Sequence, residues 1–289
     1  MKLADQAPSV SGHHVVVDGV RCHYLEAGAG PPLVLLHGTA IDSATLSYGP
    51  SLAALARHHH VMALDWPGYG DSERPRVDMT MLEYVALLEA FLDAKGLSSA
   101  HLAGFSMGGA VALGLALRAP QRVQTLTLMA SYGLDSRAPV PLVGYIALRA
   151  PKLSAGVSWG MRRSRRLTRL VLTRIVFSNP RLVTDDLVEA VHEQLKAPEA
   201  ERSFVAWLRG ELRPFRLGTS YEAQLPAVAV PTLLIHGRND RVVSWRKAAR
   251  ASQLVPGARL EVVPNCGHWV MREAQQFFLA KLVEFTGGR

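Results

Sequence analysis

The chain has only two cysteines in 289 residues, Cys22 and Cys266, which is too few for a disulfide framework. It has no apolar run of about 18 residues, so we expect no membrane-crossing helix. The first eight residues lack the apolar stretch of a secretory signal peptide, and we therefore expect a cytoplasmic protein. The sequence shows neither an internal repeat nor a low-complexity tract.

The composition is that of a globular protein, with 48% hydrophobic and 19% charged residues. This length can form one large α/β domain with a lid. The net charge of +8 is unevenly distributed: residues 136–216 hold 15 Lys and Arg against 7 Asp and Glu, and the remainder holds 17 of each. The basic excess therefore lies entirely in one middle segment.

Strand and helix patterns alternate over most of the chain. Residues 14–26 predict a hairpin with Asp18-Gly19 at its turn. Apolar strand runs then recur at 33–37, 60–65, 99–103, 123–129, 231–236 and 259–263, with helical patterns at 44–57, 80–95, 107–118, 244–254 and 271–286. This alternation predicts a mainly parallel sheet covered by helices on both faces, with the functional site at the carboxyl ends of the strands.

The alternation stops after Met129. Between about Tyr132 and Ala223 we find helical segments and no convincing strand. We therefore predict a core domain formed by residues 1–131 and 224–289, with a helical cap, or lid, at 132–223.

Arginines are concentrated within the predicted cap, at residues 162–174. A helix there would place Arg162, Arg166 and Arg169 on one face, and Leu167 and Leu170 on another. Such a face can be simply solvated, contact an anionic membrane or lipid weakly, or steer acidic substrates. No recognition motif accompanies the charge, so we expect no nucleic-acid partner.

A serine lies at the tip of a sharp turn in Gly104-Phe105-Ser106-Met107-Gly108. An apolar strand precedes this G-x-S-x-G sequence and a helical pattern follows it, which is the arrangement of a nucleophile elbow. The flanking glycines are required because a Cβ there would collide where strand and helix approach closely. The turn would present the Ser106 hydroxyl at a helix N-terminus, where negative charge is stabilised.

Two further polar loops follow predicted strands, in the chain order Ser, Asp, His that is typical of enzymes with a nucleophile elbow. A nucleophilic serine requires a histidine base, which an acid must orient. Asp240 follows the strand run at 231–236, and His268 follows the run at 259–263. The alternative acid is Asp135, which lies after the sixth strand.

Other histidines compete with His268 for the role of base. His37 and His236 end strands, and we expect them to bind loop backbone. His101 lies within a strand, and we expect it in the core. The run His58-His59-His60 follows a helix and is predicted to meet solvent; no partners with suitable spacing point to a metal site there.

These motifs together resemble the α/β-hydrolase superfamily, from about Val15 to Phe285. The sequence from Asp65 to Ser72 strengthens the resemblance, because this family usually carries a D-x-x-G-x-G-x-S loop after its fourth strand. The resemblance implies an α/β-hydrolase fold, with a mainly parallel eight-stranded sheet, helices on both faces and a helical cap inserted after strand 6.

The resemblance also implies a reaction that needs no metal and no organic cofactor. Ser106 would attack a carbonyl carbon, His268 would accept and later return its proton, and Asp240 would orient the imidazole. The backbone N–H groups of Met107 and Thr39 would form the oxyanion hole. Water would then release the acyl group.

The kind of hydrolase is less constrained. Related dehalogenases and most epoxide hydrolases have Asp at the elbow, so Ser106 argues against both. Cys266-Gly267-His268-Trp269 resembles the carboxyl-terminal motif of carbon–carbon hydrolases, but the Gly-Pro-Gly that they typically carry after the His-Gly turn is absent from 37–43. We therefore predict a hydrolase of small-molecule carboxylic esters, with hydrolysis of vinylogous diketones as the alternative.

Lactonase, thioesterase and perhydrolase activities and a non-catalytic ligand receptor also stay open, as does the oligomeric state.

Overall fold

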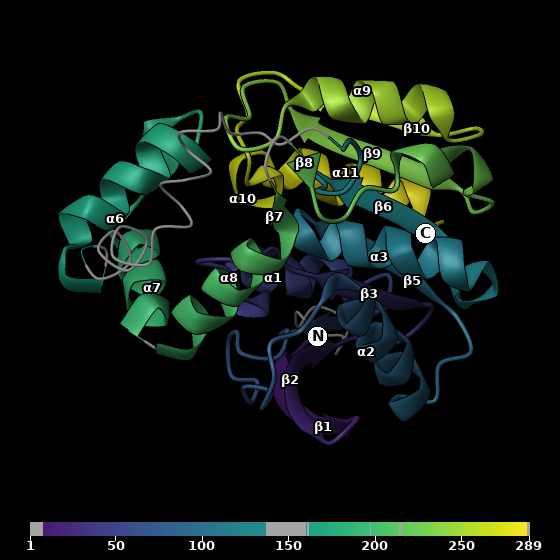
Figure 1. Ribbon diagram of the computed structural model, residues 1–289, viewed down its shortest axis with the longest axis horizontal. Helices are drawn as coiled ribbons and strands as arrows, with labels where there is room; N and C mark the ends of the chain where they lie inside the picture. The colour runs from purple at the N-terminus through teal and green to yellow at the C-terminus, as the bar shows by residue number, and fades with distance from the viewer. Residues whose placement is uncertain (1–7, 137–159, 161, 197, 214–215, 288–289) are drawn as a thin grey trace, which may run out of the picture.

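The computed structural model describes residues 8–136, 160, 162–196, 198–213 and 216–287. Its centre is an eight-stranded sheet in the order β1-β2-β4-β3-β5-β6-β9-β10 (Figure 1). The strands are β1 Ser11–Val17, β2 Val20–Ala27, β3 Pro32–Leu36, β4 His60–Leu64, β5 Ala100–Phe105, β6 Val123–Met129, β9 Thr232–Gly237 and β10 Arg259–Val263. From β4 to β10 all neighbours are parallel, whereas β1 and β2 are antiparallel. The predicted mainly parallel sheet is confirmed.

The predicted hairpin and helices are also present. Asp18 and Gly19 turn the hairpin with φ angles of 47° and 78°, the left-handed values that a two-residue turn between twisted strands requires. The helices of the sheet domain are α1 Ala44–Leu55, α2 Met81–Ala94, α3 Met107–Arg118, α9 Trp245–Leu254, α10 Val270–Glu273 and α11 Gln275–Phe285. The single helix expected at 271–286 is thus divided in two at Ala274.

Alternate side chains of the strands point to opposite faces of the sheet and form two apolar clusters. In β3, Val34 and Leu36 join the cluster of α2, α3 and α9, whereas Leu33 and Leu35 join that of α1, α10 and α11. Both sets are fully buried. This two-sided burial explains why the strands are continuous apolar runs rather than alternating ones.

The segment between β6 and β9 is mainly helical where it is described. It contains α6 Arg165–Val171, the π-helical turn η2 Leu172–Val176, the 3-10 turn η3 Pro180–Leu182, α7 Asp185–Lys196 and α8 Pro198–Glu211. One addition to the prediction is a pair of two-residue strands, β7 Leu212–Arg213 and β8 Arg216–Leu217. In Figure 1, α6 and α7 lie beside the sheet domain and α8 leads back toward it. The division into core and cap at 132 and 223 stays a prediction.

The apolar side of α7 belongs to the same cluster as one face of the sheet. Leu187, Val188 and Val191 of α7 are buried in the cluster that also contains Trp269 and Val270. Phe177 contributes from the preceding loop, with its ring 6.0 Å from that of Trp269. The inserted helices therefore share apolar packing with the sheet domain.

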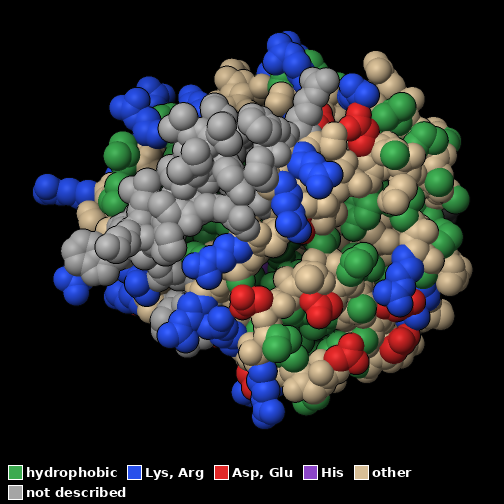
Figure 2. All heavy atoms as spheres, in the orientation of Figure 1, with side chains coloured by type: hydrophobic (Ala, Val, Ile, Leu, Met, Phe, Trp, Pro, Cys, Tyr) green, Lys and Arg blue, Asp and Glu red, His purple; other side chains and the backbone are tan. Residues whose placement is uncertain are grey.

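Basic side chains are present on the side of the inserted helices. Figure 2 shows Lys and Arg both on this side and over the sheet domain, whereas Asp and Glu lie mainly over the sheet domain. Two of the cap arginines are paired, Arg165 with Glu189 and Arg169 with Asp185. Among the described residues, no helix has the length and apolar character to cross a membrane.

The histidine run is not simply exposed, so this prediction is wrong for its middle member. His59 is fully buried and, within the described part of the chain, neither of its ring nitrogens has a hydrogen-bond partner. Its ring lies 5.9 Å from that of His101, whose Nδ1 is 2.9 Å from Thr125 Oγ1. His101 is thus the core residue that we expected. Burial and the neighbouring His59 lower the pKa of His101 from 6.5 to about 4.

We predict that His101 makes the fold acid-sensitive. In the unfolded chain His101 takes up a proton below its ordinary pKa of 6.5, whereas in the folded chain it stays neutral down to about 4. Stability is therefore lost as the pH falls from 6.5 toward 4. Between pH 7 and pH 5, the free energy of unfolding should fall by on the order of 1 kcal/mol more in the wild type than in His101→Asn. Urea unfolding at both pH values tests this; equal losses would contradict it.

Candidate active site

The elbow between β5 and α3 holds Ser106 in a strained conformation. Its φ of 50° and ψ of −113° lie in a region that non-glycine residues rarely adopt. The Ser106 N–H donates to Met129 O at 2.9 Å, and its carbonyl oxygen accepts from Tyr132 N–H at 3.0 Å. These bonds to β6 and the residues after it hold the strained turn in place.

Close backbone contacts explain the two glycines of the motif. A Cβ on Gly104 would lie 2.3 Å from Gly108 O, and a Cβ on Gly108 would lie 2.3 Å from Leu36 O. Neither contact is possible for a real side chain. The predicted steric requirement is confirmed, and it places the start of α3 against the end of β3.

The loop after β3 carries the predicted oxyanion donor Thr39. Asp42 is buried and accepts hydrogen bonds from Gly38 N–H at 2.7 Å and from the Ser47 hydroxyl at 2.8 Å. The Thr39 hydroxyl is 2.6 Å from the Tyr69 hydroxyl. Within the described residues, the backbone N–H groups of Thr39 and Met107 donate no hydrogen bond. As far as the described residues go, both N–H groups can donate to a ligand.

Two neighbouring motifs stabilise this loop. The Nδ1 atom of His37 lies 2.7 Å from Gly38 O, and its Nε2 accepts from Trp66 N–H at 3.1 Å, so the ring proton is on Nδ1. His37 therefore binds loop backbone, as we expected. In the loop after β4, Gly70 has a φ of 53°, and a Cβ there would lie 2.1 Å from the Asp65 carboxylate. The spacing of the D-x-x-G-x-G motif follows from this contact.

The structure brings Asp240 and His268 together from loops that are distant in sequence. His268 Nδ1 donates to Asp240 Oδ2 at 2.8 Å, while Asp240 Oδ1 accepts from the N–H groups of Val242 and Val243. Burial by itself would raise the pKa of Asp240, but the charge of His268 and hydrogen bonds from His236 and His268 hold it well below its usual range. An ionised Asp240 fixes the Nδ1–H tautomer and leaves His268 Nε2 free to accept a proton.

A second imidazole contacts Asp240 in a way that our sequence analysis missed. His236 Nε2 lies 3.0 Å from Asp240 Oδ2 and 2.9 Å from Val243 O. Both neighbours are acceptors, so the ring proton is on Nε2. The sequence did contain a signal for this contact: His236 and Asp240 are four residues apart at the end of β9, so one loop can bring their side chains together.

Ser106 and His268 come from neighbouring parts of the site but are not hydrogen bonded in this conformation. The imidazole of His268 packs against Phe105, the residue before Ser106, with ring centroids 4.8 Å apart. Among the described residues, the Ser106 hydroxyl forms no hydrogen bond to the imidazole. Such contacts are often long without substrate and tighten when it binds.

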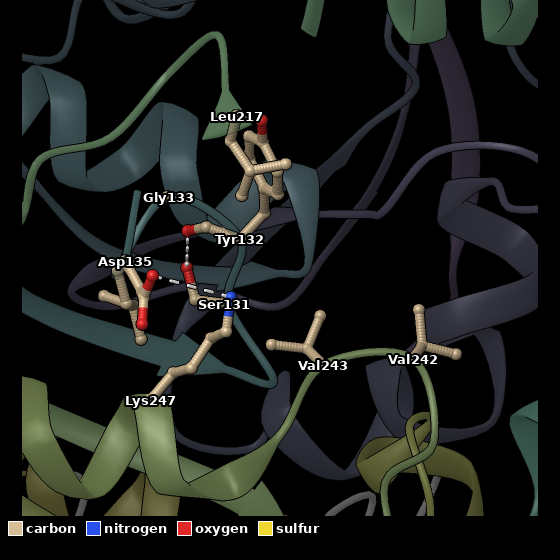
Figure 3. Close-up of a pocket in the computed structure, with 9 residues that line it drawn as sticks. Ser131, Tyr132, Gly133, Asp135, Leu217, Val242, Val243 and Lys247 are labelled. Carbon is tan, nitrogen blue, oxygen red and sulfur yellow. Dashed lines mark hydrogen bonds and ion pairs between the residues drawn. The ribbon is translucent and has the colours of Figure 1, made fainter. Parts of the chain in front are cut away.

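The alternative acid, Asp135, has a different partner. Its carboxylate lies 3.8 Å from Lys247 Nζ, across a small pocket that Leu217, Val242 and Val243 also line (Figure 3). The pair ties the segment after β6 to α9. The geometry therefore favours Asp240 as the partner of the imidazole.

The described residues can be compared with what a metal site or a reactive thiol would need. No group of three or more His, Cys, Asp or Glu side chains there could hold a metal ion. Cys22 and Cys266 are buried and unpaired by a disulfide. Burial raises the pKa of both thiols to about 12, so neither is a thiolate at neutral pH.

We predict that Asp240, rather than Asp135, sustains the reactivity of Ser106. Asp240→Asn should slow labelling of Ser106 by a fluorophosphonate probe by about 10⁴-fold, because an amide can stabilise the wrong imidazole tautomer. Asp135→Asn should change the rate by less than about threefold, since the ion pair with Lys247 that it weakens does not involve the imidazole. Labelling rates measured on folded proteins test this; a larger loss in Asp135→Asn would reverse the assignment.

Comparisons with known proteins agree with this architecture. The family model described as the alpha/beta hydrolase fold matches residues 31–275. The 2-hydroxymuconate semialdehyde hydrolase of Pseudomonas putida is 31% identical over 98% of this chain and 96% of its own length. The 2-hydroxy-6-oxo-2,4-heptadienoate hydrolase of Pseudomonas putida strain F1 is 29% identical over 95% of each chain.

Solved structures give the same result. The meta-cleavage product hydrolase of Pseudomonas fluorescens IP01, as an S103A mutant complexed with acetates, superposes with a TM-score of 0.80 at 27% identity. The match covers 95% of this chain and 97% of that one. The chain therefore belongs to the α/β-hydrolase fold family and is a hydrolase.

Proposed function

We propose that this protein hydrolyses a carbon–carbon bond in an acidic vinylogous diketone or the corresponding aldehyde. Its relatives are named as hydrolases of 2-hydroxy-6-oxo-2,4-heptadienoate and of 2-hydroxymuconate semialdehyde. The main support is the similarity to hydrolases of such compounds, which extends over nearly the whole of both chains. The motif from Cys266 to Trp269 adds to it. The carboxylic-ester reaction that we predicted from the sequence becomes the second candidate.

In the proposed reaction Ser106 is the nucleophile and His268 the base. The Ser106 oxygen attacks the ketone or aldehyde carbon while His268 Nε2 takes its proton, and the negative charge on the carbonyl oxygen is stabilised by the N–H groups of Thr39 and Met107. From the keto tautomer of the substrate, the carbon–carbon bond then breaks and its electron pair is delocalised into the conjugated oxo acid. The resulting dienolate receives the proton from His268. Water, deprotonated by His268, hydrolyses the acyl-enzyme and restores Ser106.

Asp240 supports both proton transfers in this scheme. The developing imidazolium of His268 is stabilised by the ionised Asp240, which already accepts the Nδ1–H. Each oxyanion donor stabilises the transition state by on the order of 3 kcal/mol. The hydrogen bonds of Asp42 and Tyr69 to the Thr39 loop therefore matter, because they hold one of these donors in position.

The charge distribution suits an acidic substrate. The relatives' named substrates include dienoates, which are anions at neutral pH. Along the sequence, residues 136–216 carry an excess of eight basic residues. A positive potential from such an excess raises the encounter rate with anions of this kind. A contact of this segment with anionic lipid stays a prediction.

Ester hydrolysis remains the second candidate because of one departure in the oxyanion loop. Thr39-Ala40-Ile41 follows the His-Gly turn where the carbon–carbon hydrolases typically have Gly-Pro-Gly. The same nucleophile, base and acid serve both reactions, and the two differ in the leaving group.

We predict a kinetic preference that separates the two candidates. The purified protein should cleave 2-hydroxymuconate semialdehyde, monitored by loss of its visible absorbance, with a kcat/KM at least about tenfold above that for p-nitrophenyl acetate. Ser106→Ala should abolish fluorophosphonate labelling and reduce both activities by on the order of 10⁶-fold. The reverse preference would establish the esterase candidate, and no activity on either substrate would contradict the proposal.

A further inference from the structure

The carboxylate of Glu273 joins two segments that are distant in sequence. It accepts hydrogen bonds from Gly267 N–H at 2.8 Å, from Ser178 N–H at 2.9 Å and from Asn179 N–H at 3.0 Å. Gly267 directly precedes His268, whereas Ser178 and Asn179 follow the π-helical turn η2, 95 and 94 residues before Glu273. One side chain thus holds the loop of the base against the inserted segment.

Two more hydrogen bonds connect the same segments. His268 N–H donates to Val176 O at 2.8 Å, and the Arg241 guanidinium donates to Arg174 O at 2.8 Å. Arg241 follows Asp240 directly. The loops of both Asp240 and His268 are therefore bonded to residues 174–179, which we call the tether segment.

The tether segment and Glu273 approach the backbone of Gly267 closely. A Cβ on Gly267 would lie 2.4 Å from Val176 O and 2.6 Å from Glu273 Oε1. The glycine therefore allows the two backbones to approach, and the approach in turn fixes the backbone from which the His268 side chain projects.

An ionised carboxylate is the side chain that these donors require. Two oxygens with about four lone-pair sites can accept all three N–H groups, whereas glutamine would turn its NH₂ group toward at least one of them. The pKa of Glu273 is raised above its ordinary value, because burial outweighs the opposite effect of the hydrogen bonds from Ser178, Asn179 and Gly267.

We propose that Glu273 is a positioning residue, which orients the His268 imidazole toward Asp240 and Ser106 by fastening the His268 loop to the tether segment. Glu273 acts through the backbone of Gly267 and His268, without contacting substrate. Packing of the tether segment against the His268 loop and orientation of the imidazole then depend on the same hydrogen bonds. The catalytic part of this inference rests on the proposed role of His268, but the geometric part does not.

The test compares Glu273→Gln with the control Glu284→Gln, which alters an exposed carboxylate of α11 that forms only surface ion pairs. Glu273→Gln should lower kcat between about tenfold and a hundredfold, as expected for a small displacement of a catalytic group. Its KM should change less than about threefold, because substrate contacts are unaffected. Glu284→Gln should match the wild type.

A proton NMR readout separates orientation from general stability. The far-downfield resonance of His268 Nδ1–H, identified by its loss in Asp240→Asn, should shift or broaden in Glu273→Gln and stay unchanged in Glu284→Gln. A variant that lowers only the thermal midpoint, with resonance and kcat unchanged, would overturn the proposal. If Glu273→Gln does not fold, Glu273→Asp, which keeps the charge on a shorter side chain, should give an intermediate loss of kcat; wild-type kcat and resonance there would overturn it.

The NMR readout also distinguishes failure of this inference from failure of the proposed function. A wild type that cleaves neither substrate, with a resonance that still depends on Glu273, would contradict the function and support the positioning role. A wild type that is active, with Glu273→Gln equal to it in both readouts, would retain the function and refute the positioning role.

Discussion

The left-handed backbone of Ser106 is the constraint on which the rest of the site depends. This conformation costs about 1–3 kcal/mol, so it persists only because the neighbouring structure enforces it. The enforcing contacts come from the glycines on either side, from β3 and from β6. The central strands of the sheet thus have to be adjacent and in register before the hydroxyl can be presented at the start of α3.

The other site groups are placed by the same sheet. Asp240 and His268 follow β9 and β10, which are parallel neighbours, so their loops leave the same edge and can meet. Asp240 then becomes a shared acceptor for two imidazoles and two backbone N–H groups. This concentration of donors keeps a buried carboxylate ionised, which the proposed proton transfer through His268 requires.

Most of the sheet domain could be predicted from the sequence, because two-sided burial leaves continuous apolar strands and the motifs have fixed spacing. The burial of His59 could not: its ring lies against that of His101 in β5, a tertiary contact that leaves no local signal in the sequence. The strands β7 and β8 are too short for any periodicity. Glu273 was missed because its partners are backbone N–H groups, which nearly every residue has. By contrast, the partner of His268 is the carboxylate of Asp240, which the order of the motifs along the chain predicted.

The apolar cluster shared by α7, Phe177 and Trp269 has a consequence for how new specificities can arise in this protein. Exchanging the inserted helices for those of a homologue would strip the cover from Trp269 and Val270 unless the graft brought matching apolar residues. The same graft would have to reproduce the carbonyl of Val176 that receives the His268 N–H. Variation in substrate preference is therefore expected to accumulate by point changes within this insert, more readily than by its wholesale replacement.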